Sequence, residues 1–313
     1  MEVLFTFMPK DHQQQMLKEQ FPEVRFHFTY KDKSRLPAAE VLVTYGEDLM
    51  EEDIHAAGNL KWIMVASAGI EKMPQNAIAE RGIIVSNVRG IHKTPMSESV
   101  IAHLLALKRS LPTIYKNQSN KEWVRKTAST ELKGSTALIL GPGAIGSEIG
   151  RLLQAFGVHT IGCNRSGTPA DYMAETISFE GIIEVLPQAD TVISVLPSTM
   201  ETKYLLRKEH FQAMKKEAVF MNFGRGDLVE DAVLIEALQN EELGFAVLDV
   251  FEQEPLPQDH PFWAMENVVV SPHISSHSGK YVERALDIFV PNLRQWLSGD
   301  GKPTNLVNME KGY

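Results

Sequence analysis

Three polar side chains that could serve one reaction each follow a predicted strand in the C-terminal half of the chain. Arg225 lies in "MNFGRGDLV", Glu254 in "VLDVFEQEPLP" and His273 in "VVVSPHISSHS". Open α/β sheets bind ligands at the carboxyl ends of their strands. An arginine can clamp an anion, a histidine can exchange a proton, and a carboxylate can be its partner. Taken singly, each residue more often has a structural role, and sequence spacing does not show that the three meet.

A glycine-rich segment, "GPGAIG", connects the predicted strand "TALIL" to an amphipathic helix. Gly141 would make the tight turn, Gly143 would leave room for a pyrophosphate, and Gly146 would let the helix pack close to the strand. Ala144 and Ile145 open the helix, whose free N–H groups would face the phosphates. An ordinary strand–turn–helix junction is the alternative. The strand, the spacing and the helix together favour dinucleotide binding.

The end of the next predicted strand, "HTIGCNRSG", lacks the acidic residue that commonly accepts hydrogen bonds from the adenine ribose of NAD. Asn164, Arg165 and Ser166 occupy that place. The arginine offers a charged donor fork that suits a 2′-phosphate, and its neighbours add neutral donors. Alternatively, Arg165 is a solvated loop charge and Asn164 bonds the ribose of NAD. We interpret the segment as favouring NADP.

Short apolar runs alternate with helical patterns along the chain, which predicts an α/β protein with two doubly wound parallel sheets. Eleven strands are expected in two sets, beginning at Val3, Val24, Val41, Trp62 and Ile83, then at Ala137, His159, Thr191, Ala218, Phe245 and Val268.

Two long helices connect the sets of strands. One begins near Thr94, a candidate cap, with Pro95 at the first helical position. The other follows the last strand and is long enough to return to the first domain. The expected domains are therefore a discontinuous one, residues 1–97 and 282–313, and a dinucleotide-binding one inserted in it, residues 98–281.

Composition excludes several classes of protein. A net charge of −9 argues against a nucleic-acid binder. The single cysteine, Cys163, rules out an internal disulfide and a multi-cysteine zinc site, so we expect no metal and a reducing, cytoplasmic location. No basic leader precedes the first strand, and no apolar run approaches the ~20 residues that span a bilayer.

Several ordered motifs resemble those of the D-isomer-specific 2-hydroxyacid dehydrogenases, over essentially the whole chain. They are "ASAGIEKMP", "GIHKTPMSESVIAHLL", "LKGSTALILGPGAIG", "SVLPSTMET", "NFGRGDLVE", "VLDVFEQEPLP" and "SPHIS". The chain is most similar to short members that lack a C-terminal regulatory domain. The resemblance implies a Rossmann domain inserted in a flavodoxin-like substrate domain, and a homodimer.

The resemblance also implies roles for individual residues. Arg225 would bind the substrate carboxylate and carbonyl oxygen, Glu254 would pair with His273, and His273 would exchange the proton. Ala68 and Gly69 would present backbone N–H groups to the carboxylate. Further residues would lie along the cofactor on its nicotinamide side: Leu196, Pro197, Thr202, Phe223, Gly224, Asp249 and Ser275.

The predicted function is NAD(P)H-dependent reduction of a small 2-oxo acid to the D-2-hydroxy acid, with NADP preferred and NAD as the alternative cofactor. Phosphoglycerate dehydrogenase is the second candidate, and a non-enzymatic dinucleotide sensor on the same fold is the third. Glu71 stands where many relatives carry aspartate, and Ser276 and His277 where relatives often have glycine and an aromatic residue. These departures leave the size of the substrate open.

Overall fold

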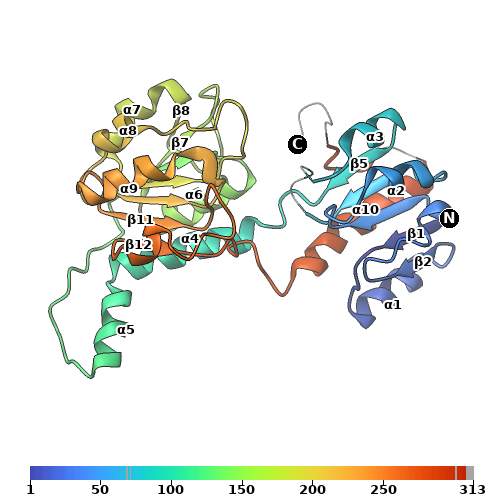
Figure 1. Cartoon of the computed structure of the whole chain (residues 1–313), viewed down its shortest axis with the longest axis horizontal. Coiled ribbons are helices and arrows are strands. Elements are labelled where there is room, and N and C mark those ends of the chain that lie inside the picture. The colour runs from blue at the N-terminus through green and yellow to red at the C-terminus, as the bar shows by residue number, and fades with distance from the viewer. Residues whose placement is uncertain (68–69, 71, 300–301, 308–313) are drawn as a thin grey trace. The chain divides into compact units, whose positions relative to one another are not determined.

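The computed structural model describes residues 1–67, 70, 72–299 and 302–307. It contains two compact units, one formed by Met1–Ile91 with Ser278–Tyr313 and the other by His92–His277 (Figure 1). The expected domain boundaries, after residues 97 and 281, lie a few residues farther along the chain. Which unit binds substrate and which binds the dinucleotide stays a prediction.

The first unit is built on a five-stranded parallel sheet in the order β2-β1-β3-β4-β5. This is the flavodoxin-like strand order that the family resemblance implied. The sequence predicted all five of its strands: β1 (Glu2–Phe5), β2 (Arg25–Phe28), β3 (Val41–Thr44), β4 (Trp62–Val65) and β5 (Ile84–Asn87).

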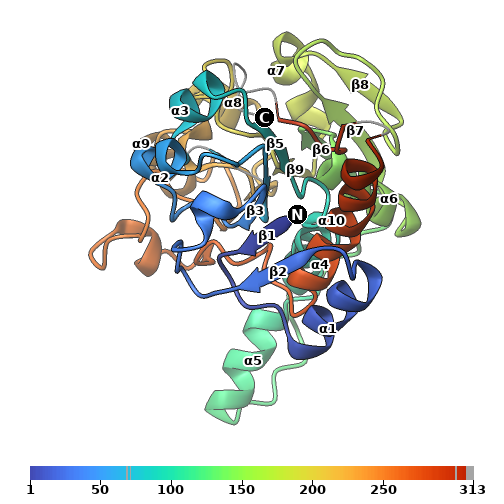
Figure 2. The same cartoon turned by 90° about the vertical axis from the view of Figure 1, so that its right-hand side faces the viewer.

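Helices cover both faces of this sheet, because its strands are apolar on both sides. Helices α1 (Asp11–Gln20) and α10 (Tyr281–Ser298) lie on one face, and α2 (Glu51–Ala56) and α3 (Gln75–Glu80) lie on the other (Figure 2). In α10, Phe289 stacks against the fully buried Trp62 at 5.8 Å between ring centroids. This contact ties the C-terminal helix to the first sheet.

The second unit has a seven-stranded parallel sheet in the order β12-β11-β10-β9-β6-β7-β8, and the order reverses between β9 and β6, as in a Rossmann fold. Its strands are β6 (Thr136–Leu140), β7 (His159–Cys163), β8 (Glu175–Ile177), β9 (Thr191–Ser194), β10 (Val219–Asn222), β11 (Phe245–Leu248) and β12 (Val268–Val270). Six were predicted. The sequence analysis missed β8, because this edge strand has only three residues and begins at the exposed Glu175.

The helices of the second unit are α4 (Lys93–Lys108), α5 (Leu111–Asn120), α6 (Ala144–Ala155), α7 (Ile182–Val185), α8 (Lys208–Ala213) and α9 (Asp231–Gln239). Helices α4 and α6 pack on one face of the sheet, and α7, α8 and α9 pack on the other. Single 3₁₀ turns occur at Leu36–Ala38, Phe179–Gly181, Leu186–Gln188, Gly226–Leu228 and Pro261–Ala264.

The predicted start of α4 was wrong by a few residues. The helix begins at Lys93 and its N-cap is His92, so Thr94 lies inside the first turn and does not cap it. Pro95 is the third helical residue. It fits there because the first four N–H groups of a helix have no partner within the helix, so a missing N–H costs nothing.

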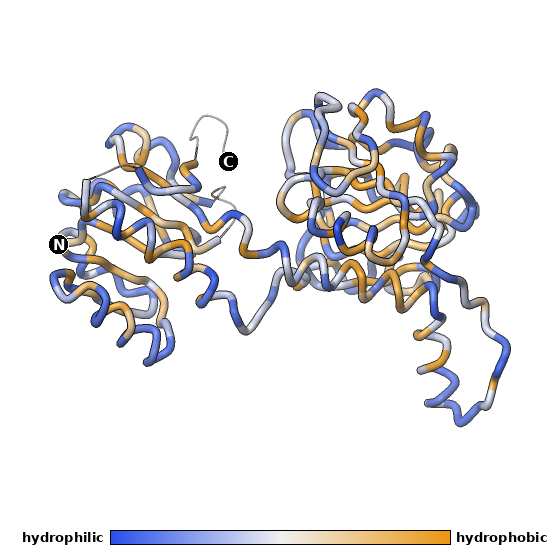
Figure 3. Tube along the Cα trace, turned by 180° about the vertical axis from the view of Figure 1, so that it is seen from behind, coloured by the Kyte–Doolittle hydropathy of each residue, from blue (hydrophilic) through white to orange (hydrophobic). Residues whose placement is uncertain are grey.

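Hydropathy follows this arrangement. The strands of both sheets are hydrophobic, whereas hydrophilic and hydrophobic stretches alternate along α5 and the loop after it (Figure 3). Within the part of the chain that the structure describes, no helix combines the length and the apolar character needed to cross a membrane.

Candidate active site

The three candidate catalytic residues follow three strands that lie side by side. Arg225 comes after β10, Glu254 after β11 and His273 after β12, and β11 pairs with both of the other strands. Because all three strands are parallel, their carboxyl ends share one edge of the sheet. The topology therefore gathers these loops where open α/β sheets bind ligands.

His273 and Glu254 are in direct contact. The imidazole Nδ1 lies 2.8 Å from Oε2 of Glu254, and the other carboxylate oxygen accepts the N–H of Phe251 at 3.1 Å. A carboxylate can only accept, so Nδ1 carries the proton in this pair and Nε2 is left to face a reactant. The backbone of His273 is left-handed, with φ of 53°. This conformation is costly for most residues other than glycine and is common at functional sites.

A buried carboxylate fixes the loop that carries His273. Asp249 is fully buried and accepts the hydroxyl of Ser271 and the N–H groups of Ile274 and Ser275, the latter two at 3.0 and 3.1 Å. Three hydrogen bonds to one carboxylate satisfy a group that would otherwise be expensive to bury. Asp249 thus bonds the backbone just after His273 and the side chain of Ser271 just before it, a role that the sequence did not reveal.

The loop of Arg225 is shaped by its neighbours. The amide of the buried Asn222 donates to the carbonyl of Arg225 at 2.9 Å and accepts the N–H of Gly224 at 3.1 Å. The guanidinium donates to the carbonyl of Gly224 at 2.9 Å, and the side chain is half-buried. The arginine therefore projects from a backbone turn that is already closed by hydrogen bonds.

The glycines on either side of Arg225 are required by close backbone contacts. A Cβ on Gly226 would lie 1.9 Å from the carbonyl carbon of Phe251, and a Cβ on Gly224 would lie 2.4 Å from the carbonyl oxygen of Leu196. Real Cβ atoms do not approach other atoms this closely. The Arg225 loop is thus wedged between the loop that leads to Glu254 and the loop after β9.

The glycine-rich turn after β6 is closely packed at Gly146 and open to its surroundings at Gly143. Gly141 has φ of 92°, a left-handed conformation that favours glycine. A Cβ on Gly146 would lie 2.4 Å from the carbonyl oxygen of Gly141, so the helix can pack this closely on the turn only because residue 146 is a glycine. Gly143 is the N-cap of α6, and a Cβ there would meet no atom within 4 Å. Ala144 and Ile145 begin the helix. The turn fits the pyrophosphate of a dinucleotide, because no side chain at Gly143 covers the N-terminus of α6.

A match to a protein-family model identifies the family of this chain. The family model of the D-isomer specific 2-hydroxyacid dehydrogenase NAD binding domain matches residues 101–275, which are more than half of the chain. This chain belongs to the D-isomer specific 2-hydroxyacid dehydrogenase family. The two parallel sheets and the glycine-rich turn are the fold that this family membership requires.

Relatives of this dehydrogenase include reductases and dehydrogenases of small acids. A putative 2-hydroxyacid dehydrogenase of Haemophilus influenzae is 31% identical, over 84% of this chain and 86% of the relative. The human glyoxylate reductase/hydroxypyruvate reductase is 33% identical, over 80% and 78%. A D-3-phosphoglycerate dehydrogenase of Methanocaldococcus jannaschii is 31% identical, over 88% of this chain and 53% of the relative.

Solved structures agree with this assignment. A D-isomer specific 2-hydroxyacid dehydrogenase family protein from Aeromonas salmonicida superposes with a TM-score of 0.87 at 32% identity, covering 98% of this chain and 99% of the other. An NADPH-dependent glyoxylate/hydroxypyruvate reductase from Sinorhizobium meliloti, in complex with NADP and sulfate, has a TM-score of 0.80 at 26% identity and covers 100% and 99%.

The segment after β7 in this dehydrogenase folds on itself. Oδ1 of Asn164 accepts the N–H groups of Ser166 and Thr168 at 3.1 and 3.2 Å, and its Nδ2 donates to the carbonyl of Thr168 at 2.7 Å. The hydroxyls of Ser166 and Thr168 lie 2.6 Å apart. Asn164 thus shapes the turn from inside, while Arg165 extends to an ion pair with Glu201 at 2.9 Å. Sequence reasoning singled out neither Thr168 nor Glu201.

The residues expected along the nicotinamide side are largely enclosed. Leu196 and Phe223 are buried, as is Thr202, whose hydroxyl donates to the carbonyl of Pro197 at 2.6 Å and accepts the N–H of Thr199 at 2.8 Å. In this structure Thr202 therefore ties its own loop together. The contacts of these residues with a cofactor stay a prediction.

His103 of α4 is a further polar residue near this edge that sequence reasoning missed. Its ring lies 6.0 Å from that of Phe223, and burial lowers the pKa of the imidazole while the charge of Asp249 acts in the opposite direction. The available signal was a histidine within the apolar stretch "VIAHLLAL". The predicted substrate contacts Ala68 and Gly69, with Glu71, lie outside the described residues.

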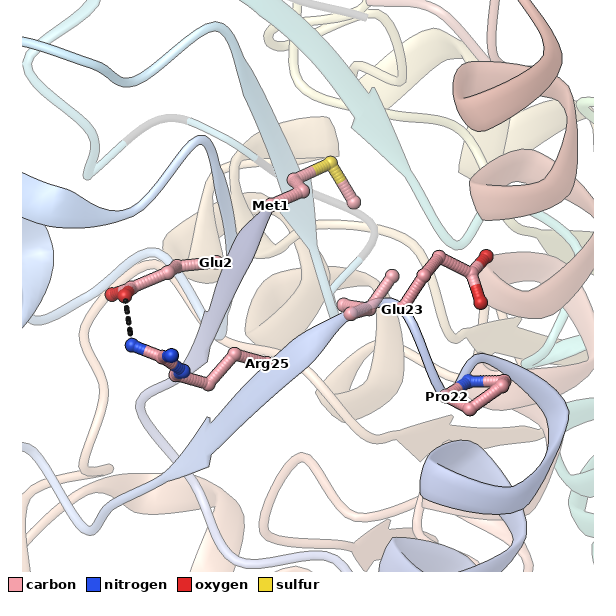
Figure 4. A pocket seen from close by; sticks show the side chains of 6 residues that line it. Met1, Glu2, Pro22, Glu23 and Arg25 are labelled. Carbon is pink, nitrogen blue, oxygen red and sulfur yellow. Dashed lines mark hydrogen bonds and ion pairs between the residues drawn. The ribbon is translucent and has the colours of Figure 1, made fainter.

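The first unit has a hollow of about 460 Å³. It is lined by Met1, Glu2, Pro22, Glu23, Val24 and Arg25 (Figure 4). Glu2 and Arg25 form an ion pair across it at 3.0 Å. The hollow lies at the amino ends of β1 and β2, opposite to the edge at which open α/β sheets bind ligands.

Proposed function

We propose that this dehydrogenase reduces a small 2-oxo acid to the D-2-hydroxy acid and prefers NADPH to NADH. The contact between His273 and Glu254, beside the Arg225 loop at one edge of the dinucleotide-binding sheet, is the observation that supports the reaction best. A histidine with one nitrogen bonded to a carboxylate presents its other nitrogen to the reactant in a fixed orientation.

The proposed reaction divides its tasks among three side chains. The bound nicotinamide supplies a hydride for the keto carbon of the substrate. Negative charge grows on the keto oxygen as this carbon is reduced, and His273 donates a proton to that oxygen from Nε2. Glu254 holds the imidazole through Nδ1 and balances its positive charge. Arg225 binds the substrate carboxylate and the keto oxygen and orients the carbon for attack.

Backbone groups complete the proposed substrate site. By relationship to the family, the N–H groups of Ala68 and Gly69 would bind the substrate carboxylate together with Arg225.

The preference for NADPH rests on the turn after β7. Asn164, Arg165 and Ser166 provide no carboxylate to bind the ribose hydroxyls, whereas the exposed guanidinium of Arg165 can bind a phosphate with two parallel hydrogen bonds. The relative from Sinorhizobium meliloti is named as NADPH-dependent, which supports the same preference.

A substrate panel with both cofactors tests the proposal. Purified protein is assayed for oxidation of NADPH and of NADH with glyoxylate, hydroxypyruvate, pyruvate, larger 2-oxo acids and phosphohydroxypyruvate. We expect at least one small 2-oxo acid to be reduced, with a higher kcat/KM for NADPH, and the product to be the D-isomer. Equal or better use of NADH would refute the cofactor preference but not the reaction.

Two other outcomes would identify the remaining candidates. Reduction of phosphohydroxypyruvate alone would identify a phosphoglycerate dehydrogenase, an activity named among the relatives. Tight binding of a dinucleotide without oxidation of it by any acid in the panel would identify a sensor protein.

A further inference from the structure

The ion pair between Arg165 and Glu201 joins the two loops that flank the glycine-rich turn. Arg165 follows β7, Glu201 follows β9, and both strands pair with β6, on opposite sides of it. Nη2 of the arginine lies 2.9 Å from Oε1 of the glutamate. The pair therefore connects loops on either side of the strand whose carboxyl end carries the predicted pyrophosphate site.

Hydrogen bonds within each loop fix its shape, so the ion pair joins two ordered segments. Asn164 closes the first loop with bonds to Ser166 and Thr168. In the second loop, the buried Thr202 bonds to Thr199. The N–H of Glu201 itself donates to the hydroxyl of Thr199 at 3.3 Å.

The carboxylate of Glu201 lies beside the donor fork that a phosphate would need. A guanidinium binds phosphate best when two of its N–H groups point at the same anion. Nη2 of Arg165 already lies within ion-pair distance of Glu201, and a dianionic phosphate beside that carboxylate would be repelled. The side chain of Arg165 is 75% exposed and that of Glu201 48% exposed, so water screens this repulsion and makes it moderate.

We propose that Glu201 is a specificity-determining residue that opposes the 2′-phosphate of NADPH. It pairs with Arg165 in the free protein and must release the guanidinium, or share it, when the phosphate binds. NADH lacks this phosphate and leaves the pair intact. The inference rests on the proposed role of Arg165, and it makes the expected preference for NADPH smaller than Arg165 alone would produce.

Binding measurements separate Glu201 from Arg165. The full-length variants E201Q, R165A and R165A/E201Q are titrated by calorimetry with adenosine 2′,5′-bisphosphate, 5′-AMP, NADPH and NADH, at low and at high salt. E180Q is the matched control, because Glu180 is also an exposed carboxylate near the Arg165 loop. It accepts the hydroxyl of Ser178 at 3.0 Å, and Ser178 pairs with Ser166 of that loop.

E201Q should bind the two ligands with a 2′-phosphate roughly two- to fivefold more tightly, the size expected for removal of one exposed competing charge. 5′-AMP and NADH should bind E201Q as they bind the wild type. The gain should shrink at high salt, and it should be smaller in the R165A background, where only the direct repulsion of the phosphate by Glu201 remains. E180Q should show a smaller gain than E201Q. A purely structural role of Glu201 would not tighten the binding of one class of ligand.

Unchanged or weaker binding of 2′-phosphate ligands by E201Q overturns the proposal, as does an equal change for NADH. The failure of the underlying cofactor preference looks different. If R165A weakens neither NADPH nor adenosine 2′,5′-bisphosphate, the role of Arg165 fails. If R165A weakens both by about tenfold or more while E201Q does nothing, only the role of Glu201 fails.

Discussion

His273 is held in place from its side chain and from its backbone. Glu254 bonds Nδ1, and the hydrogen bonds of Asp249 to Ser271, Ile274 and Ser275 fix the chain around it. Such a histidine is oriented before any substrate arrives, so little ordering remains to be done during the reaction.

Replacement of His273 by alanine should therefore remove the proton donor without disturbing the cofactor site. We expect kcat for 2-oxo acid reduction to fall by about 10²- to 10⁴-fold, the usual contribution of a positioned acid or base. The Kd of NADPH, measured by calorimetry, should change little. Turnover close to that of the wild type would exclude His273 as the proton donor.

Arg225 should be just as intolerant of a conservative change. An ammonium cannot reproduce the planar fork that binds a carboxylate through two N–H groups, so Arg225→Lys should raise KM for the oxo acid and lower kcat together. We expect a loss of kcat/KM of roughly tenfold or more, given the ~1.5–3 kcal/mol of a charged hydrogen bond. Steady-state kinetics at saturating NADPH provide the measurement, and unchanged values of both constants would contradict the clamp.

The residues that sequence reasoning found are those that the proposed chemistry would use. Arg225, Glu254 and His273 stand out because charged side chains at strand ends are unusual, and the structure brings Glu254 and His273 into contact. Glu201 and Thr168 were missed because their significance lies in contacts with other loop residues. A spacing pattern along the sequence does not report such contacts.

At the scale of elements, the loops of the site are coupled by glycines. Gly226, next to Arg225, lies against the carbonyl of Phe251, whose own N–H donates to Glu254. A displacement of one loop must therefore move the other. The position of the proposed anion clamp and that of the histidine partner are fixed by the same backbone contact.

Substitution of Gly226 by alanine should disturb both loops at once. Its Cβ would lie 1.9 Å from the backbone of Phe251, which has no flexible end that could move aside. We expect a loss of stability of about 1–3 kcal/mol or more, seen as a lower melting temperature, together with a loss of turnover. Gly58→Ala is the control, because a Cβ there meets no atom within 4 Å. Equal melting temperatures of the two variants would refute the coupling.

The strands were more predictable than the ends of the elements. Eleven apolar runs became strands because buried parallel strands need apolar side chains on both faces. The edge strand β8 escaped because it pairs on one side only and is polar at its start. The start of α4 was misplaced because a sequence that allows a cap at Thr94 also allows the helix to begin at Lys93. Local preferences of this size do not decide between neighbouring positions.

At the scale of the whole molecule, α5 and the segment after it are the feature that a single chain leaves unexplained. None of the ten residues of α5 is buried, and the helix extends away from the sheet of its unit (Figures 1 and 2). Ile114, Tyr115, Trp123 and Val124 are between 43% and 93% exposed. In the structure these side chains do not cover the core of their own chain.

We propose that a second copy of the chain covers these side chains, as the family resemblance implies. Clusters of exposed large apolar groups mark interfaces, because burying them removes apolar area from water. Sedimentation at micromolar concentration should give a homodimer. Replacing Tyr115 and Trp123 by aspartate should shift the protein towards monomer, whereas Met200→Asp, at a methionine that is 97% exposed in the loop after β9, should not. A wild-type monomer would refute the dimer, and an unchanged dimer in the double variant would place its interface elsewhere on the chain.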